Sequence, residues 1–355
     1  MAEAIEVDEG EAYETFVARG WTDGLPIVAP TPAKVDAMLR ATGSSADDVV
    51  GTVKARSRSV TAEKVAINAV MAGCTPAFFP VVMAAVAAAL DPSFNINTVV
   101  TSTGGAAICV VVSGPLAAEI GMNSRHNALG SGNRANATIG RAVRLVAVNV
   151  LGARTGAMDG SSLGHPGKYT LCLAEDPPPP PWSPLGVDLG FAVGDTTVTV
   201  LPTEAPHQIA NHLNGDPAGV VATIAAAMRN PAQFAVGKGG QGLVVLGPEH
   251  ASAIIDGGWT RPMVQQALWE RSRIRPAELE AAGVVIERGA QHDMTPSPDG
   301  MLPTMASPDD IFVVTAGGAG GGWSAYLPSW APVIHSRAAT RRVGDHGSRE
   351  TPVTP

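Results

Sequence analysis

A repeated order of helix, strand and turn constrains the fold of this chain more than any other feature of its sequence. The segments 75–95 and 216–234 match, because each has a cap residue before a proline, an Ala-rich helix, an Asp-Pro or Asn-Pro pair and an aromatic residue. The segments 106–121 and 242–255 then match as a β-branched strand, a Gly-Pro turn and a short helix. Self-similarity of this kind is typical of repeated structural units. The sequence therefore predicts an internally duplicated α/β fold, with two similar α/β halves and a cleft between them.

The repeats divide the chain into five expected segments. A helical and extended N-terminal segment (1–59) precedes a first α/β repeat (60–173), and a second repeat with a glycine-rich strand and loop at its end covers 195–335. A proline-rich connector (174–194) joins the repeats, and its five consecutive prolines predict an extended spacer. The last segment (336–355) is expected to be a disordered tail.

Charge and composition exclude several classes of protein. The net charge is −8 and no basic stripe with aromatic residues is visible, so nucleic acids and anionic membranes are not expected partners. The apolar stretch 65–90 is long enough to span a bilayer, but Asn68, Pro76 and Pro80 interrupt it, so buried helices or turns joined near Cys74 are predicted instead. An acidic N-terminus without signal-peptide features and three cysteines without paired spacing indicate a cytoplasmic protein.

Cys74 is the first candidate catalytic residue. It stands directly before an expected helix start at Thr75 and Pro76. The partial positive charge and free N–H groups of a helix N-terminus would lower the pKa of the thiol and favour the nucleophilic thiolate. The alternative is that Cys74 is a small buried hydrophobic residue, as Cys109 and Cys172 are expected to be.

A polar segment, 123–144, is the strongest candidate for an anion site. Asn133 to Asn136 open onto an expected helix N-terminus, whose backbone N–H groups and dipole, with a guanidinium group, would hold a carboxylate or a phosphate. The spacing matches neither the P-loop nor the dinucleotide fingerprint, so no cofactor is assigned. The alternative is a capped turn with surface arginines. The predicted substrate-binding residues are Asn123, Arg125, Asn127, Asn133, Arg134, Asn136 and Lys168.

Histidines supply further candidates. His126 lies in the polar segment. His165 and Lys168 lie in a tight turn, GHPGKY (164–169), where His165 would serve as an acid/base group and Lys168 as an anion contact. A loop histidine beside proline and glycine is also an ordinary turn residue. His207, His212 and His250 would form a metal site only if the fold brought them together, so no metal ligand is predicted.

A glycine run at 315–324 follows an expected buried strand, which is the position of phosphate-binding loops. No amphipathic helix follows, because Pro328 comes soon after. The run therefore indicates a glycine-rich lid or a ligand-facing turn.

Five segments in combination resemble an uncharacterised bacterial family. They are GWTDGLPIVAPT (20–31), EKVAINAVMAGCTP (63–76), NALGSGNRANATIGRA (127–142), LGHPGKY (163–169) and LGPEHA (246–251). That family is linked to small proteins with a (seleno)Cys-Gly-Ser-Cys motif, as neighbours or as fused domains. This chain has no such motif. The resemblance covers about residues 20–330 and implies a partner that supplies a redox-active thiol or selenol, with Cys74 as a second thiol.

These observations predict an enzyme, or a subunit of a hetero-oligomeric enzyme, that acts on a small anionic substrate. The expected chemistry is thiol-dependent, a reductive or lyase-type cleavage of a carbon–heteroatom bond, with Cys74, His126 and His165 as catalytic residues. One alternative is a non-catalytic binding or scaffold subunit. Another is a metal-dependent hydrolase that uses His207, His212 and His250.

Overall fold

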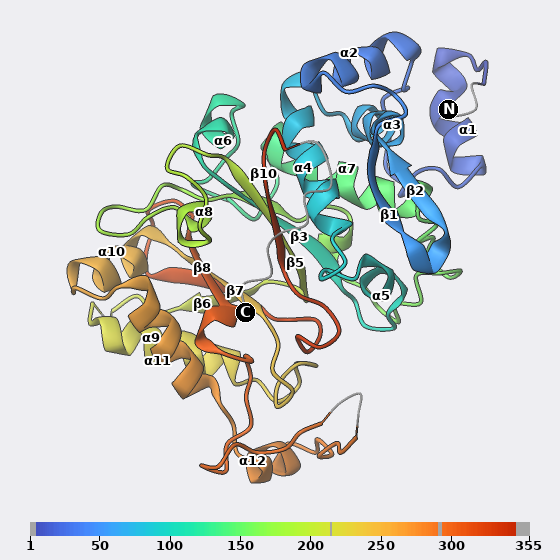
Figure 1. The fold of residues 1–355 in the computed structure, drawn as a ribbon. Helices are drawn as coiled ribbons and strands as arrows, with labels where there is room; N and C mark the ends of the chain where they lie inside the picture. The colour runs from blue at the N-terminus through green and yellow to red at the C-terminus, as the bar shows by residue number, and fades with distance from the viewer. Residues whose placement is uncertain (1–4, 214, 290–292, 346–355) are drawn as a thin grey trace.

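The computed structural model describes residues 5–213, 215–289 and 293–345, and shows an α/β fold (Figure 1). Two four-stranded sheets lie at the centre of the described chain. The first has the order β10–β5–β3–β4 and the second has the order β6–β9–β7–β8. The bounds of these strands are Ala107–Ser113 (β3), Cys172–Ala174 (β4), Thr197–Thr203 (β5), His207–Ala210 (β6), Gly242–Leu246 (β7), Ile311–Thr315 (β8), Trp323–Leu327 (β9) and Ala339–Arg342 (β10).

The pairing directions are the same in the two sheets. β3 pairs in parallel with β4 and antiparallel with β5, just as β7 pairs in parallel with β8 and antiparallel with β9. The outer strands β10 and β6 then pair antiparallel with β5 and β9. Each central strand, β3 or β7, runs directly into a Gly-Pro turn and a helix.

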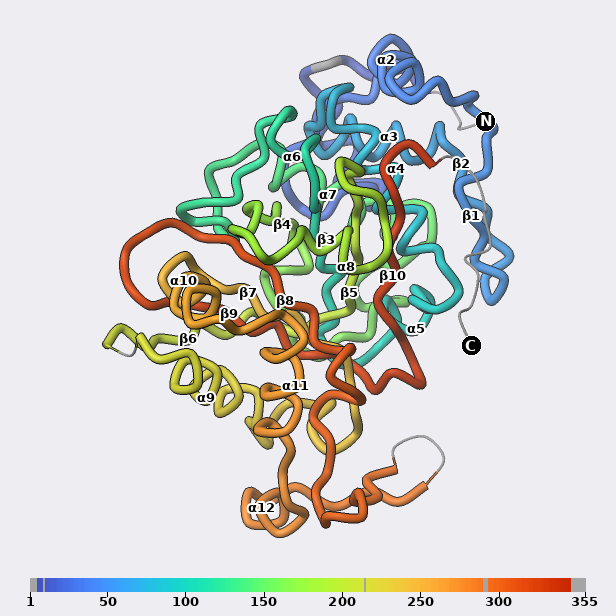
Figure 2. The backbone as a smooth tube through the Cα atoms, turned by 60° about the vertical axis from the view of Figure 1, so that its left-hand side comes forward, coloured from blue at the N-terminus to red at the C-terminus, as the bar shows by residue number. Residues whose placement is uncertain are grey.

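The two sheets pack face to face between two layers of helices. Successive side chains of a strand point to opposite faces, so Cys109 and Val111 of β3 contact the second sheet, in one apolar cluster with Leu243 and Val245 of β7. Their neighbours along each strand face the helices instead. The helices α3 (Ala62–Ala72), α4 (Phe79–Ala89) and α7 (Arg134–Asn149) cover the first sheet, and α9 (Pro217–Met228), α10 (Pro248–Asp256) and α11 (Arg261–Ser272) cover the second (Figure 2).

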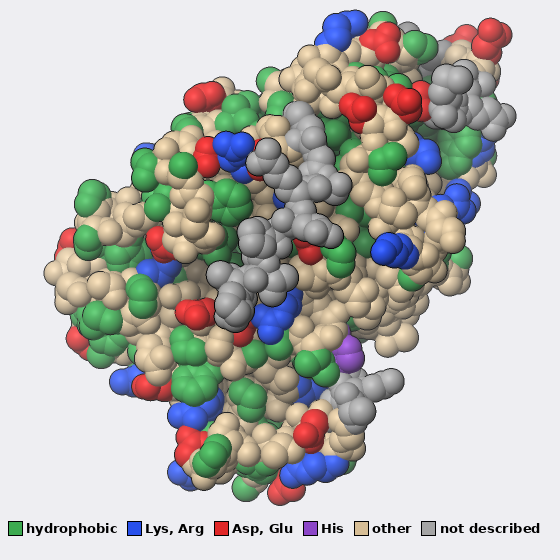
Figure 3. Space-filling model, in the orientation of Figure 1, with side chains coloured by type: hydrophobic (Ala, Val, Ile, Leu, Met, Phe, Trp, Pro, Cys, Tyr) green, Lys and Arg blue, Asp and Glu red, His purple; other side chains and the backbone are tan. Residues whose placement is uncertain are grey.

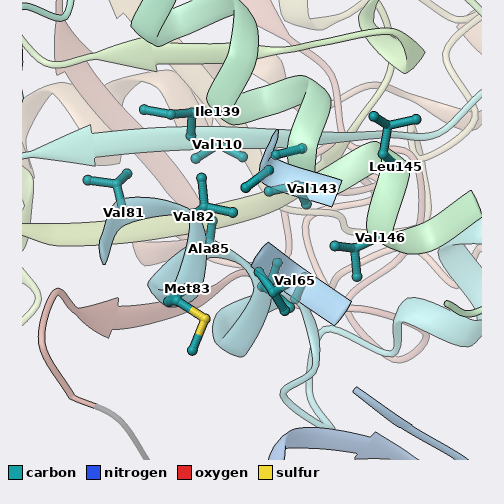
Figure 4. Packing of buried hydrophobic residues seen from close by; sticks show 14 of the residues in the cluster. Val65, Val81, Val82, Met83, Ala85, Val110, Ile139, Val143, Leu145 and Val146 are labelled. Atoms are coloured by element: carbon teal, nitrogen blue, oxygen red, sulfur yellow. The ribbon is translucent and has the colours of Figure 1, made fainter. Parts of the chain in front are cut away.

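The helix α7 shows how the sequence specifies this layer. Asn133 accepts a hydrogen bond from the backbone N–H of Asn136 and so caps the helix. Ile139, Val143 and Val146 recur at helical spacing and are buried against α3, α4 and β3 (Figure 4). The helix N-terminus expected at Asn133 to Asn136 is therefore confirmed.

The outer strands exchange between the sheets. After β5 in the first sheet the chain crosses into the second sheet as β6, and after β9 in the second sheet it returns to the first as β10. β5 was expected in the second repeat but lies in the first sheet. Residues 339–342, expected in a disordered tail, form β10 along β5. The rest of that expected tail, 346–355, lies outside the described residues.

The remaining elements lie around this core. No helix of the described residues is long and apolar enough to cross a membrane, and the stretch 65–90 divides between α3 and α4, as predicted. On the face in Figure 3, acidic and basic side chains are interspersed. The other elements are η1 (Glu9–Glu11), α1 (Ala12–Ala18), α2 (Pro32–Thr42), β1 (Val49–Val53), η2 (Lys54–Arg56), β2 (Arg58–Thr61), η3 (Pro76–Phe78), α5 (Ile96–Thr101), α6 (Pro115–Glu119), η4 (Pro166–Lys168), α8 (Leu185–Asp188), α12 (Pro276–Ala281) and η5 (Pro308–Asp310).

Candidate functional site

Three arginines of α7 connect the motif segments to one another. Arg141 binds Asp23 through Nε at 2.8 Å and through Nη2 at 2.7 Å. Arg134 donates from Nε and Nη2 to the backbone carbonyl of Gly73, and Arg144 lies 2.6 Å from Asp159. Three of the five motif segments, 20–31, 63–76 and 127–142, therefore meet at α7 in the first half.

Cys74 lies between the end of α3 and the expected helix start at Thr75 and Pro76, where η3 begins and runs directly into α4. Its backbone N–H bonds to Ala69, and the helix that follows, η3, is a three-residue 3-10 turn. Burial raises the pKa of the thiol to about 12, although Thr138, Arg134 and Arg141 act in the opposite direction. The expected lowering of the Cys74 pKa is therefore wrong. Burial also raises the pKa values of Cys109 and Cys172, so all three thiols are protonated at neutral pH.

The asparagines of the polar segment bind the protein's own backbone. Asn136 exchanges two hydrogen bonds of 2.9 Å with the backbone of Asn123. Asn127, with φ of +63°, donates to Ser131, and Asn133 caps α7 and donates to Gly121. Together with the Arg134 contact to Gly73, these bonds build the capped turn that was the alternative to an anion site.

A cavity of about 110 Å³ opens at the carboxyl ends of β7 and β8. The carboxyl ends of parallel strands are where α/β proteins commonly bind ligands, because the loops that follow diverge there. The walls come from two parts of the chain: Leu246, Pro248, Ala251, Ser252, Thr315, Ala316 and Gly317 from the second half, and Asp176, Pro177 and Pro179 from the connector.

The loop at 123–127 borders this cavity. Ser124 accepts a hydrogen bond from the backbone N–H of Gly317 at 2.8 Å and donates to the Asp176 carboxylate at 2.9 Å. Arg125 follows, with its side chain 77% exposed and its Nε 3.8 Å from Asp176. Of the predicted substrate-binding residues, Arg125 therefore presents an exposed charge beside a cavity.

His126 extends from the same loop to the glycine run. Its Nε2 lies 2.9 Å from the carbonyl oxygen of Ala319. A carbonyl oxygen only accepts hydrogen bonds, so Nε2 carries the proton and Nδ1 of the neutral ring has a free lone pair. A Cβ at Gly318 would lie 2.1 Å from the imidazole, so glycine is required for the ring to lie in this place.

The glycine run also binds a carboxylate of its own chain. Gly320 and Gly321 donate backbone hydrogen bonds of 2.8 and 3.1 Å to Oε1 of Glu249, and these bonds hold the pKa of Glu249 below its usual value. Ala316 and Gly317 line the cavity. The run thus faces a cavity at its start and is fixed by Glu249 further along.

The three histidines considered as metal ligands, His207, His212 and His250, do not form a metal site. His250 is buried, and its two ring nitrogens are bound to Ser324 and to the carbonyl of Asn211. His212 packs edge-on against Trp323, with 4.8 Å between ring centroids, and His207 begins β6. Within the described residues, no group of three His, Cys, Asp or Glu side chains could hold a metal ion.

His165 and Lys168 belong to a different place in the first half. Lys168 Nζ lies 2.8 Å from the Asp159 carboxylate, which also pairs with Arg144. Burial lowers the pKa of His165, so its ring is neutral at pH 7. Arg134 beside Cys74 and Arg144 beside this cluster are ten residues apart on α7, about 15 Å along the axis. The predicted catalytic residues therefore do not share one site.

Several residues of these sites were not predicted, namely Asp159, Arg144, Asp176 and Ser124. Each of them forms a hydrogen bond with a partner that lies 15 or more positions away in the chain. No local sequence pattern predicts such pairs. No protein-family model and no curated protein matches this chain, so its function has to be argued from these contacts.

Proposed function

We propose that this chain is the substrate-binding subunit of a cytoplasmic, hetero-oligomeric enzyme that acts on a small anionic molecule. The observation that carries the proposal is the cavity of about 110 Å³ at the ends of β7 and β8, with Arg125 and His126 held at its border. A cavity of about 150 Å³ accommodates benzene. The substrate, or the part of it that enters, is therefore a group of only a few heavy atoms.

Each group at the border has a role in this proposal. The Arg125 guanidinium has five N–H donors and only its Nε is near Asp176, so its outer edge can bind a carboxylate of the substrate. The first turn of α10 has no side-chain cap, and Pro248 and Ser252 of this helix line the cavity, so in this proposal the N-terminus of α10 binds the negative charge of the substrate. The free Nδ1 of His126 would accept or return a proton.

We propose that the reactive thiol or selenol comes from a partner rather than from this chain. A thiol with a pKa of about 12, as for Cys74, is a thiolate in roughly one molecule in 10⁵ at pH 7. Reductive or lyase-type cleavage of a carbon–heteroatom bond needs a far larger thiolate fraction. A small protein with a Cys-Gly-Ser-Cys or selenocysteine motif would supply it. The same burial of Cys74 favours the second candidate, a non-catalytic binding subunit.

We also propose that the two α/β halves arose by internal duplication. Their sheets share strand order and pairing directions, and their central strands both end in a Gly-Pro turn. An apolar cluster joins the facing sides of the two sheets. In this view the cavity at Asp176 and Gly317 is the part of the cleft that stays open.

The test begins with a mild affinity purification from the native host, followed by mass spectrometry of co-eluting proteins. We expect a stoichiometric small protein with a Cys-Gly-Ser-Cys or selenocysteine motif. Turnover by the complex should be lost in His126→Ala and kept in Cys74→Ser, with His207→Ala on β6 as the matched control. A chain that turns over substrate alone, and loses this activity in Cys74→Ser, would refute the partner-thiol proposal. The catalytic roles predicted for Cys74 and His165 stay predictions that the same assay tests.

A further inference from the structure

Two polar residues of the motif segment 246–251 lie against the glycine run. Neither Glu249 nor His250 is among the residues that line the cavity at the ends of β7 and β8. Glu249 accepts hydrogen bonds from two backbone N–H groups of the run. His250 binds the carbonyl of Asn211, whose own N–H donates to the carbonyl of Gly322 at the end of the run. The polar part of this motif therefore supports the glycine run.

The middle of the glycine run depends on this support. Residues 316–322 form no helix or strand. Of the backbone N–H groups at 318–321, only those of Gly320 and Gly321 donate hydrogen bonds within the described part of the chain, and both donate to Glu249. Glycine loses more conformational freedom on folding than any other residue, so such a segment does not order itself. Glu249 supplies the hydrogen bonds that order it.

One peptide group joins Glu249 to His126. The carbonyl of Ala319 accepts the hydrogen bond of the His126 Nε2 at 2.9 Å, and the N–H of the same peptide group, which belongs to Gly320, donates to Glu249 at 2.8 Å. A peptide group is planar, so its C=O and its N–H turn together. Hydrogen bonds in a chain also polarise one another. The Glu249 carboxylate therefore fixes the direction of the Ala319 carbonyl and makes it a better acceptor.

We propose that Glu249 is a positioning residue for His126. It holds the peptide group between Ala319 and Gly320 so that the proton of the neutral ring stays on Nε2 and the lone pair of Nδ1 stays free. This inference rests on the proposed function, in which His126 moves a proton at the cavity. Both bonds from the run go to Oε1 of Glu249, and Oε2 has no hydrogen-bond partner within the described residues. One well-placed oxygen is therefore enough, and the amide oxygen of a glutamine can replace it.

Nitrogen NMR of the His126 ring in the full chain tests this inference without any substrate, at about pH 9, where imidazole rings are neutral. We expect a single tautomer in wild type and mixed tautomers in Glu249→Ala. Glu249→Asp keeps the charge but is one CH₂ group shorter, so it should also give mixed tautomers. Glu249→Gln keeps the length and should keep the single tautomer. These last two variants decide the question alone if Glu249→Ala does not fold.

Glu278→Ala is the matched control for the ring spectrum. Glu278 also lies in the first turn of a helix of the second half, α12, and accepts a backbone hydrogen bond, from Arg275. Its removal should leave the His126 signals unchanged. A single tautomer in both Glu249→Ala and Glu249→Asp would overturn the inference, and so would mixed tautomers in Glu249→Gln.

Turnover by the complex separates this inference from the proposed function. If both hold, kcat should fall at least about tenfold in Glu249→Ala, because general acid–base catalysis contributes about 10²–10⁴-fold and the acid–base group is no longer oriented. KM should stay within about twofold of wild type, and Glu249→Gln should restore kcat. Mixed tautomers with unchanged turnover would support the positioning of His126 by Glu249 and refute the proton transfer by His126 in the proposed function.

Discussion

The two sheets share strand order and pairing, but the carboxyl ends of their parallel strands are used differently. In the first sheet, the buried carboxylate of Glu175 fills this end, where it accepts hydrogen bonds from Ser113 and Leu185. Arg261, the first residue of α11 in the second half, lies 3.5 Å from it. In the second sheet, Leu246 and Thr315 end the strands, and a cavity opens there. The residues that follow a strand, rather than the strand order, decide whether its end is closed or open.

The largest effect on stability is expected from removal of β10, the strand that follows the second sheet in the chain but pairs in the first. A chain ending at residue 338 lacks β10, which pairs with β5 over four residues, and loses the ion pair of Arg341 with Asp91. Since whole domains are stable by only about 5–15 kcal/mol, we expect this chain to lose cooperative unfolding. A chain ending at residue 345 is the control and should unfold as the full chain does. Circular dichroism during thermal unfolding measures both. Cooperative unfolding without β10 would show that the halves do not depend on strand exchange.

The next largest loss of stability is expected at the closed end of the first sheet, where Glu175 is buried. Arg261→Leu would leave the Glu175 carboxylate, whose side chain is 1% exposed, without its cationic partner. Removal of one partner of a buried ion pair costs about 3–5 kcal/mol, and urea unfolding should show a loss of this size. In the double variant Glu175→Gln with Arg261→Leu no buried charge is left unpaired, because Asp188, the other partner of Arg261, is 36% exposed, so the loss should be smaller. Equal losses in the single and double variants would mean that packing of Arg261 on Trp182, 4.8 Å away, is what matters.

The repeated elements were predictable from sequence because their signals are local. The Gly-Pro turns at 114–115 and 247–248, and the helices α4 and α9, lie where the repeat places them. β10 was not predictable, because it is only four residues long and pairs with β5 about 140 positions earlier. Cys74 shows the limit for the site: its sequence neighbours correctly indicate a helix start, but the thiol is buried in the apolar core of the first half, and this burial raises its pKa instead of lowering it. The Glu175–Arg261 and Asp159–Lys168 pairs equally depend on tertiary contacts.

Two carboxylates of the first half should affect stability with opposite dependence on pH. Burial raises the pKa of Glu175, so its contribution is present below its unfolded pKa and is lost as pH rises through the folded value. The pKa of Asp159 is lowered to about 2 by Lys168, Ser161 and Arg144, which outweigh burial, so its contribution is present above pH 4 and is lost as pH falls towards 2. Relative to wild type, Glu175→Gln should gain stability as pH rises above 4.5, the ordinary value for a glutamate. Asp159→Asn should gain it as pH falls from 4 to 2. Parallel pH profiles of the two variants would contradict these opposite signs.

The smallest effect on stability is expected at the open end, where one glycine holds a ring in place. A Cβ in Gly318→Ala would lie 2.1 Å from the His126 imidazole. His126 is exposed, so the ring can move away at a cost below about 1 kcal/mol. It would then lose the hydrogen bond from Nε2 to Ala319 that fixes its tautomer. Nitrogen NMR of the ring should show mixed tautomers in Gly318→Ala and a single one in wild type.

Gly320→Ala is the control for this measurement, because a Cβ there meets nothing within 4 Å. The His126 signals should therefore be unchanged in Gly320→Ala. If Gly318→Ala also leaves them unchanged, the Ala319 carbonyl does not fix the ring, and His126 has no ordered lone pair to offer at the cavity. The first sheet has a buried carboxylate, that of Glu175, at the equivalent strand ends. If the Gly318→Ala signals do change, a fixed imidazole at the second sheet is the feature that makes the open end, and not the closed one, a place for proton transfer.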